Sequence, residues 1–115
     1  MPTFAFGLSD NQSGTGPAAI TAASTAQATG TALSGFQNVV TTAAGETAVV
    51  LPATHAVGSP IVVRVTSATA GLLFPPVGGA INGGSTNASF SVAQNKPVVC
   101  FAHANGLDYT VILSA

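Results

Sequence analysis

Residues 98–113 read VVCFAHANGLDYTVIL, two apolar and β-branched runs on either side of an Asn105-Gly106 pair. Asn-Gly between alternating segments is a strong signal for a β-hairpin, because both residues tolerate the positive φ angles of a type I′ turn. We therefore predict a hairpin in which residues 98–104 pair with residues 107–113. Both faces of these strands are mostly apolar, so each face is expected to need a covering layer, the second of them supplied by a subunit interface.

The same strand pattern continues upstream of the hairpin. Further β-branched runs begin after Phe36 and recur about every 8 to 12 residues, separated by Pro, Gly and Asn residues that fix or invert φ. These runs lie at 39–42, 48–51, 61–66, 71–74 and 87–92. The spacing predicts an all-β fold over residues 36–115, a small β-sandwich or jelly-roll-like domain.

Residues 1–35 have a different composition. Between residues 9 and 35 the chain is nearly all Ala, Ser, Thr and Gly, with Ile20 and Leu33 as the only large apolar residues. Such a segment cannot bury enough apolar surface to build a core. We predict that it is part of an extended N-terminal arm, residues 1–35, that forms an interface. An Ala-rich helix over residues 18–28 is the second interpretation, since it falls below the ~12 to 15 residues that hold alone in water.

The first residues of the arm carry its aromatic side chains. Phe4, Phe6 and Leu8 share one face at the strand period of two, which predicts a short strand or an anchoring tip. Buried aromatic anchors often dominate a protein interface. These three residues, together with Ile20 and Leu33, are therefore candidate interface residues.

Charge is scarce along the whole chain. Its 115 residues include two basic and three acidic side chains, whereas about a quarter of the residues of an ordinary soluble domain are charged. Two basic residues cannot neutralise enough phosphates to bind nucleic acid, so no nucleic-acid partner is expected. A nearly neutral surface favours association. We predict a structural component whose surface is covered by partners, and not an enzyme.

Arg64 is a sixth candidate interface residue. It is a lone charge on the otherwise neutral run 61–66. It could pair across an interface with Glu46 or Asp108 of a neighbouring copy, because a guanidinium binds carboxylates in a fixed geometry. The alternative is a solvated charge that protects an edge strand.

The side chains that could bind a metal or act in catalysis do not form a recognisable motif in the sequence. His55 and His103 lack the neighbouring Cys, Asp or Glu that a zinc site needs, so no metal is expected. Cys100, His103 and Asp108 suggest a thiol triad only superficially, since a cysteine in the middle of an apolar strand usually behaves as a small hydrophobic residue. We predict no catalytic residue and no cofactor.

Neither a membrane nor an export signal is indicated. No run approaches the ~18 to 20 apolar residues of a spanning helix, and residues 1–16 contain no Lys or Arg. A single cysteine excludes an intramolecular disulfide. We expect a protein made in a cytosol, without a membrane partner.

The order of short motifs over residues 26–113 resembles a β module that recurs in structural proteins of tailed bacteriophages. Each motif alone is common, but nine in this order are more specific. They are AQAT (26–29), NVVTT (38–42), VVLP (49–52), IVVRV (61–65), LFPP (73–76), AIN (80–82), ASFSV (88–92), KPVV (96–99) and DY (108–109). The module often has Trp where this chain has Tyr109, and Asn where it has Arg64.

The resemblance implies one of two roles in a virion. The first is a capsid decoration (cement) protein, usually a homotrimer, which binds the major capsid protein on the outer capsid surface after synthesis in the host cytoplasm. The second is a domain of a tail or head fibre that binds a host receptor or glycan, for which loops 75–87 and 103–108 are the place to look. We expect the first role, with the arm extending the contact area.

Overall fold

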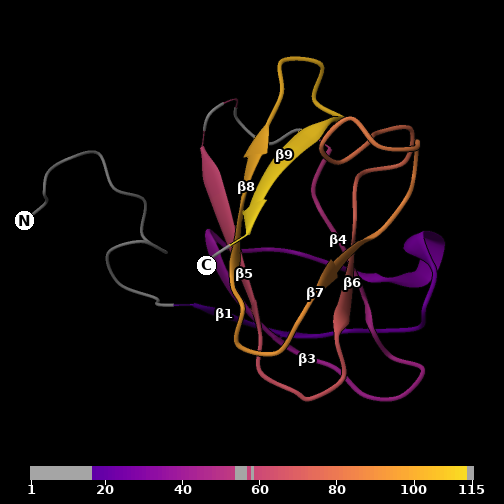
Figure 1. Ribbon diagram of the computed structural model, residues 1–115, viewed down its shortest axis with the longest axis vertical. Helices are drawn as coiled ribbons and strands as arrows, with labels where there is room; N and C mark the ends of the chain where they lie inside the picture. The colour runs from indigo at the N-terminus through magenta and orange to yellow at the C-terminus, as the bar shows by residue number, and fades with distance from the viewer. Residues whose placement is uncertain (1–16, 54–56, 58, 114–115) are drawn as a thin grey trace, which may run out of the picture.

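The structure, a computed structural model, describes residues 17–53, 57 and 59–113. Within these residues the chain is built of strands and one short 3-10 helix (Figure 1), so the all-β prediction is confirmed. The elements are β1 Ala18–Thr21, η1 Gln27–Thr29, β2 Thr31–Ala32, β3 Gln37–Thr41, β4 Ala48–Val50, β5 Pro60–Val65, β6 Gly71–Phe74, β7 Phe90–Val92, β8 Val98–Ala102 and β9 Tyr109–Leu113.

The strands form two mixed sheets. One has five strands in the order β1-β3-β5-β8-β9, and the other has four in the order β2-β4-β6-β7. The first six strands alternate between the sheets, and within each sheet they pair in parallel. The remaining neighbours, β5-β8, β8-β9 and β6-β7, are antiparallel. Figure 1 shows β5, β8 and β9 on one side of the molecule and β4, β6 and β7 on the other.

The strands predicted beyond Phe36 are present as β3 to β9. The largest difference is at β7, which begins at Phe90 and not at Asn87. Asn87 has φ 64°, a left-handed conformation that interrupts an extended strand. The backbone N–H of Ala88 then donates to the carbonyl of Ser85, at 3.1 Å, so the chain is still turning there.

The hairpin of residues 98–113 is confirmed, but its predicted turn type is wrong. β8 and β9 pair in register along their whole lengths. Gly106 has φ 76°, whereas Asn105 does not adopt the positive φ that a type I′ turn requires. The side-chain oxygen of Asn105 instead accepts hydrogen bonds from the N–H groups of Leu107 and Asp108, at 2.9 and 3.0 Å. Backbone hydrogen bonds from His103 N–H to the Asp108 carbonyl, at 2.9 Å, and from Gly106 N–H to the His103 carbonyl, at 3.1 Å, close the loop 103–108 together with this side chain.

The predicted boundary of the arm at residue 35 is wrong, because residues 17–35 belong to the fold. β1 is an edge strand of the five-stranded sheet, and β2 is an edge strand of the other. Ile20, Ala22 and Leu33 are buried in the core. A segment of small residues suffices here because the other strands supply most of the apolar surface. No α-helix covers residues 18–28, where β1 and the start of η1 lie instead, and residues 1–16 lie outside the described part of the chain.

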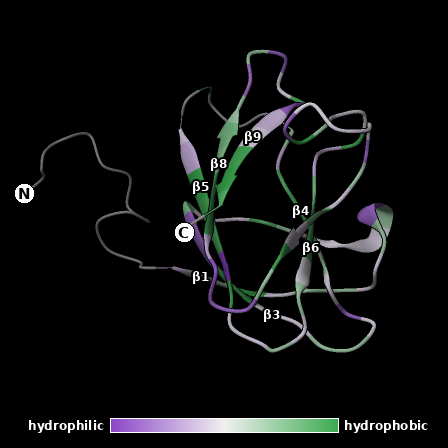
Figure 2. Cartoon of the chain, in the orientation of Figure 1, coloured by the Kyte–Doolittle hydropathy of each residue, from purple (hydrophilic) through white to green (hydrophobic). Residues whose placement is uncertain are grey.

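One cluster of buried side chains draws on both sheets. Tyr109 is the largest fully buried residue in it, and its hydroxyl donates to the carbonyl of Pro52 at 2.7 Å. Much of β8 and β9 is hydrophobic in Figure 2. The cluster includes Val40, Ile61, Val63, Val65, Val98, Cys100 and Val111 from the five-stranded sheet, and Val49, Leu73 and Val92 from the four-stranded sheet.

Three amide side chains connect segments that are distant in the sequence. Asn38, 1% exposed in β3, donates to a carbonyl of β5 at 3.2 Å. Gln27 in η1 donates to the carbonyl of Pro75 at 2.6 Å. Asn82 exchanges two hydrogen bonds with the backbone of Val111, at 2.8 and 3.1 Å. The amide of Asn38, the buried one of the three, is thus satisfied, which keeps the cost of its burial low.

Candidate interaction surface

The outward side of the five-stranded sheet is apolar and carries little charge. Along β8 and β9, residues that point inward alternate with Val99, Phe101 and Ile112, which point outward. Val99 and Phe101 are half-buried, and Ile112 is 55% exposed. The surface formed by Val39, Val62, Arg64, Val99, Phe101 and Ile112 is called the outer face below.

Strand register explains why these side chains are neighbours. Val62 of β5 pairs with Val99 of β8, and Val99 pairs with Ile112 of β9. Residues directly opposite each other on adjacent strands project to the same side and contact each other. A continuous apolar row therefore crosses three strands, and Phe101 flanks it.

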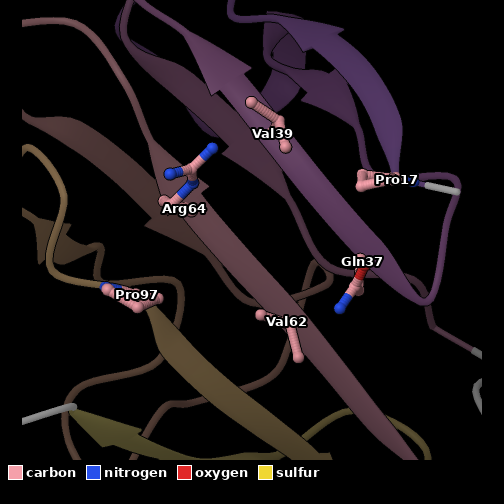
Figure 3. A pocket seen from close by; sticks show the side chains of 6 residues that line it. All are labelled: Pro17, Gln37, Val39, Val62, Arg64 and Pro97. Carbon is pink, nitrogen blue, oxygen red and sulfur yellow. The ribbon is translucent and has the colours of Figure 1, made fainter.

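A groove lies on the same side of the sheet, over β3 and β5 (Figure 3). Figure 3 shows Gln37 and Val39 on β3 beside Val62 and Arg64 on β5. Pro17 and Pro97 complete the lining, and the volume is about 300 Å³. The groove thus combines apolar walls with one cation, since the side chain of Arg64 makes no hydrogen bond or ion pair to any described residue.

The six candidate interface residues differ in where the structure places them. Arg64 is exposed on the outer face. Ile20 and Leu33 are each 7% exposed and belong to the core, so their assignment to an interface is corrected. Ile20 points inward because it alternates with exposed Ala19 and Thr21 in β1. Phe4, Phe6 and Leu8 lie outside the described residues. The outer-face residues Val62 and Ile112 were not singled out, although the alternation of their strands already placed them opposite the core.

The loops 75–87 and 103–108 lie against each other. The N–H of Ala80 donates to one carboxylate oxygen of Asp108 at 2.9 Å, and the other oxygen accepts from the side chain of Asn105 at 2.8 Å. Asp108 therefore links the two loops. Val77, 71% exposed, and His103, also exposed, stand at the surface of these loops.

The residues of the imagined thiol triad are not brought together. Cys100 is fully buried on the inward side of β8, and burial raises the pKa of its thiol to about 12. His103 is exposed and shares a 2.7 Å hydrogen bond with Thr110. Across residues 17–53, 57 and 59–113, no three His, Cys, Asp or Glu side chains gather as a metal site. The same residues include no helix long and apolar enough to cross a membrane.

The free energy of unfolding is expected to fall above pH 9. Burial raises the pKa of Cys100 from 9.0 to about 12; burial, and secondarily the charge of Cys100, raises the pKa of Tyr109 from 10.0 to about 12. The folded protein keeps both protons where the unfolded chain loses them, so this stability is complete below pH 9 and is lost as the pH rises toward 12. Urea midpoints measured from pH 7 to 11 test this, and Cys100→Ala should flatten the slope. A constant midpoint in the parent protein would contradict it.

Fold and surface together define an all-β protein of two mixed sheets that presents one apolar, weakly charged sheet face. Compared with profiles of known protein families, with curated protein sequences and with solved structures, the chain gives no significant match.

Proposed function

We propose that this chain is a capsid decoration (cement) protein of a tailed bacteriophage. It binds the outer surface of the assembled capsid as a homotrimer and bridges capsomers of the major capsid protein. The observation that carries the proposal is the outer face, where an apolar row and a groove lie open on a sheet with a single charge, Arg64. Faces of this kind normally mark a surface that another protein covers.

The motif resemblance supports the same proposal. Two of the residues in its motifs are structural, since Gln27 and Asn82 connect distant segments. Residues with such roles form a framework, on which the exposed surface can vary. Within this framework we propose a small β-sandwich. A jelly roll is antiparallel, whereas β1, β3 and β5 pair in parallel.

Stabilisation follows from mass action. A protein that binds the assembled shell, and not free capsomers, lowers the free energy of the assembled state. A homotrimer presents three copies of its contact surface, so weak individual contacts combine into avidity. Since the outer face carries a single charge, binding should depend little on ionic strength.

A fibre module that binds a host receptor or glycan is the second candidate. The observation that favours it is that loops 75–87 and 103–108 contact each other and together form one region of the surface. Neither loop contains Phe, Tyr or Trp, and aromatic side chains are frequent anchors of recognition. The outer face has the more apolar residues, so decoration is the better supported function.

Removing the protein from purified particles is expected to lower the resistance of the shell to heat and osmotic shock, and adding it back should restore that resistance. Ile112→Asp places a charge on the outer face at an exposed position and should weaken shell binding at least about tenfold. Ser91→Asp, exposed on β7 of the other sheet, is the matched control and should bind normally. Stripped shells that keep full resistance while particles lose host binding would show that the fibre role is correct.

A further inference from the structure

The described chain begins at the groove. Pro17, its first residue, is part of the groove lining, and β1 starts at the next residue on the edge of the five-stranded sheet. Sixteen residues precede Pro17 in the sequence, and they include the alternating apolar residues of the arm. The N-terminal segment is therefore tethered beside the groove.

We propose that residues 3–8 (TFAFGL) dock on the outer face of their own chain, with Phe4, Phe6 and Leu8 covering the groove and the apolar row beside it. In an extended segment these three side chains project to one side. Val39 and Val62, both half-buried, form the apolar walls that they meet.

The linker has a suitable length for docking within one chain. Residues 9–16 span at most about 26 Å when fully extended. Adjacent strands lie about 4.8 Å apart, so the distance from β3 to β8 across the sheet is about 10 Å. Gly14 and Gly16 allow the chain to reverse. A linker this short gives an effective concentration of about millimolar, which favours a chain's own segment over that of another copy.

Charge complementarity supports the same occupant. Asp10 is the only charged residue among residues 1–16 and follows Leu8 by two positions. Arg64 lines the groove, and its side chain has no hydrogen bond or ion pair to any of the described residues. Docking of residues 3–8 brings the carboxylate of Asp10 within reach of this guanidinium. The contribution of such an exposed pair is small, but it fixes the orientation of the segment.

This inference goes beyond the proposed function because it concerns the free protein. Binding to the shell through the outer face requires the segment to leave that face, so the test of the segment uses no shell. Docking is tested by cross-linking in the full-length chain without capsids. Gly7→Cys places a thiol in the segment on the side opposite the anchors, and Gln37→Cys places one at the exposed rim of the groove. Cys100 does not compete for a maleimide, since it is fully buried with a raised pKa.

A short bismaleimide is expected to join positions 7 and 37 within one chain, as seen by intact mass. The initial rate should be about tenfold higher than for the matched pair Gly7→Cys with Ser91→Cys, whose second thiol lies on the other sheet. Replacing all three anchors with serine should lower the rate about tenfold. Asp10→Asn should lower it about twofold.

Three results would overturn the proposal. Equal rates at positions 37 and 91 would mean that the segment has no preferred location. An undiminished rate in the triple serine variant would mean that the linker alone creates the proximity. A product that joins two chains in preference to one would assign the outer face to the segment of a neighbouring copy.

Discussion

Replacing Tyr109 with alanine is expected to lower the free energy of unfolding by about 3 to 5 kcal/mol. Tyr109 is fully buried, and its ring occupies the core where β9 begins. A truncated side chain leaves a cavity, and the carbonyl of Pro52 loses its 2.7 Å hydrogen bond. Small domains have a total stability of about 5 to 15 kcal/mol, so a large part of it depends on this residue.

Tyr109→Phe is the matched control. It keeps the ring and removes only the hydroxyl, so the expected loss is about 1 kcal/mol. Urea denaturation followed by circular dichroism measures both variants, with the slope of the transition as a check on the compactness of the unfolded state. Similar midpoints for the two variants would show that the ring contributes little and that the hydroxyl dominates.

Gly79→Ala is expected to cost about 3 kcal/mol, because a methyl group at this position overlaps backbone. A Cβ on Gly79 overlaps the carbonyl oxygen of Leu107 and lies 2.7 Å from its carbonyl carbon. Backbone cannot rotate away as a side chain does, so loops 75–87 and 103–108 must separate. Separating the loops would break the hydrogen bonds of Ala80 to Asp108 and Tyr109, which are 2.9 and 3.0 Å long.

Gly83→Ala is the comparison for Gly79→Ala. Gly83 has φ 71°, but a Cβ there meets no atom within 4 Å. The expected loss is about 1 to 2 kcal/mol, from the left-handed conformation alone. Urea midpoints rank the two variants, and hydrogen exchange at the amide of Ala80 reports the opening of the loops. An equal or larger loss for Gly83→Ala would show that the contact between the loops is loose.

These variants also separate stability from recognition. Tyr109 and Gly79 act inside the fold, whereas Ile112 is 55% exposed on the outer face. A decoration protein should therefore lose shell binding in Ile112→Asp with an unchanged urea midpoint. Core variants should bind normally at temperatures at which they remain folded.

Much of the second half of the fold could be predicted from residue patterns. Alternating apolar residues and Gly, Pro and Asn turns located β3 to β9, because both signals act over a few residues. The predicted type I′ turn at Asn105 was wrong because the pattern of an Asn-Gly pair does not show what the Asn side chain will bind. An Asn-Gly pair favours positive φ at both positions, but the Asn105 side chain caps the N–H groups of Leu107 and Asp108 instead.

The first half was harder to predict. β1 and β2 contain mainly Ala and Thr, which carry little hydrophobic signal, and their partners β3 and β4 are parallel strands reached after a crossing to the other sheet. The loops between them have no hairpin signature. Ile20 and Leu33 were assigned to an interface because their sequence neighbours offer no core, whereas the core comes from segments more distant in the chain.

The sequence alone determined the strand-rich character of the protein, the hairpin at residues 98–113 and the scarcity of charge, because composition and local alternation are properties of the chain itself. Only the tertiary structure decided that residues 17–35 join the sheets and that Val62, Val99 and Ile112 form one row. It also placed Arg64 beside a groove at which the described chain begins. The physical reason is that register and parallel pairing join residues far apart in the chain, and no local pattern encodes which strands become neighbours.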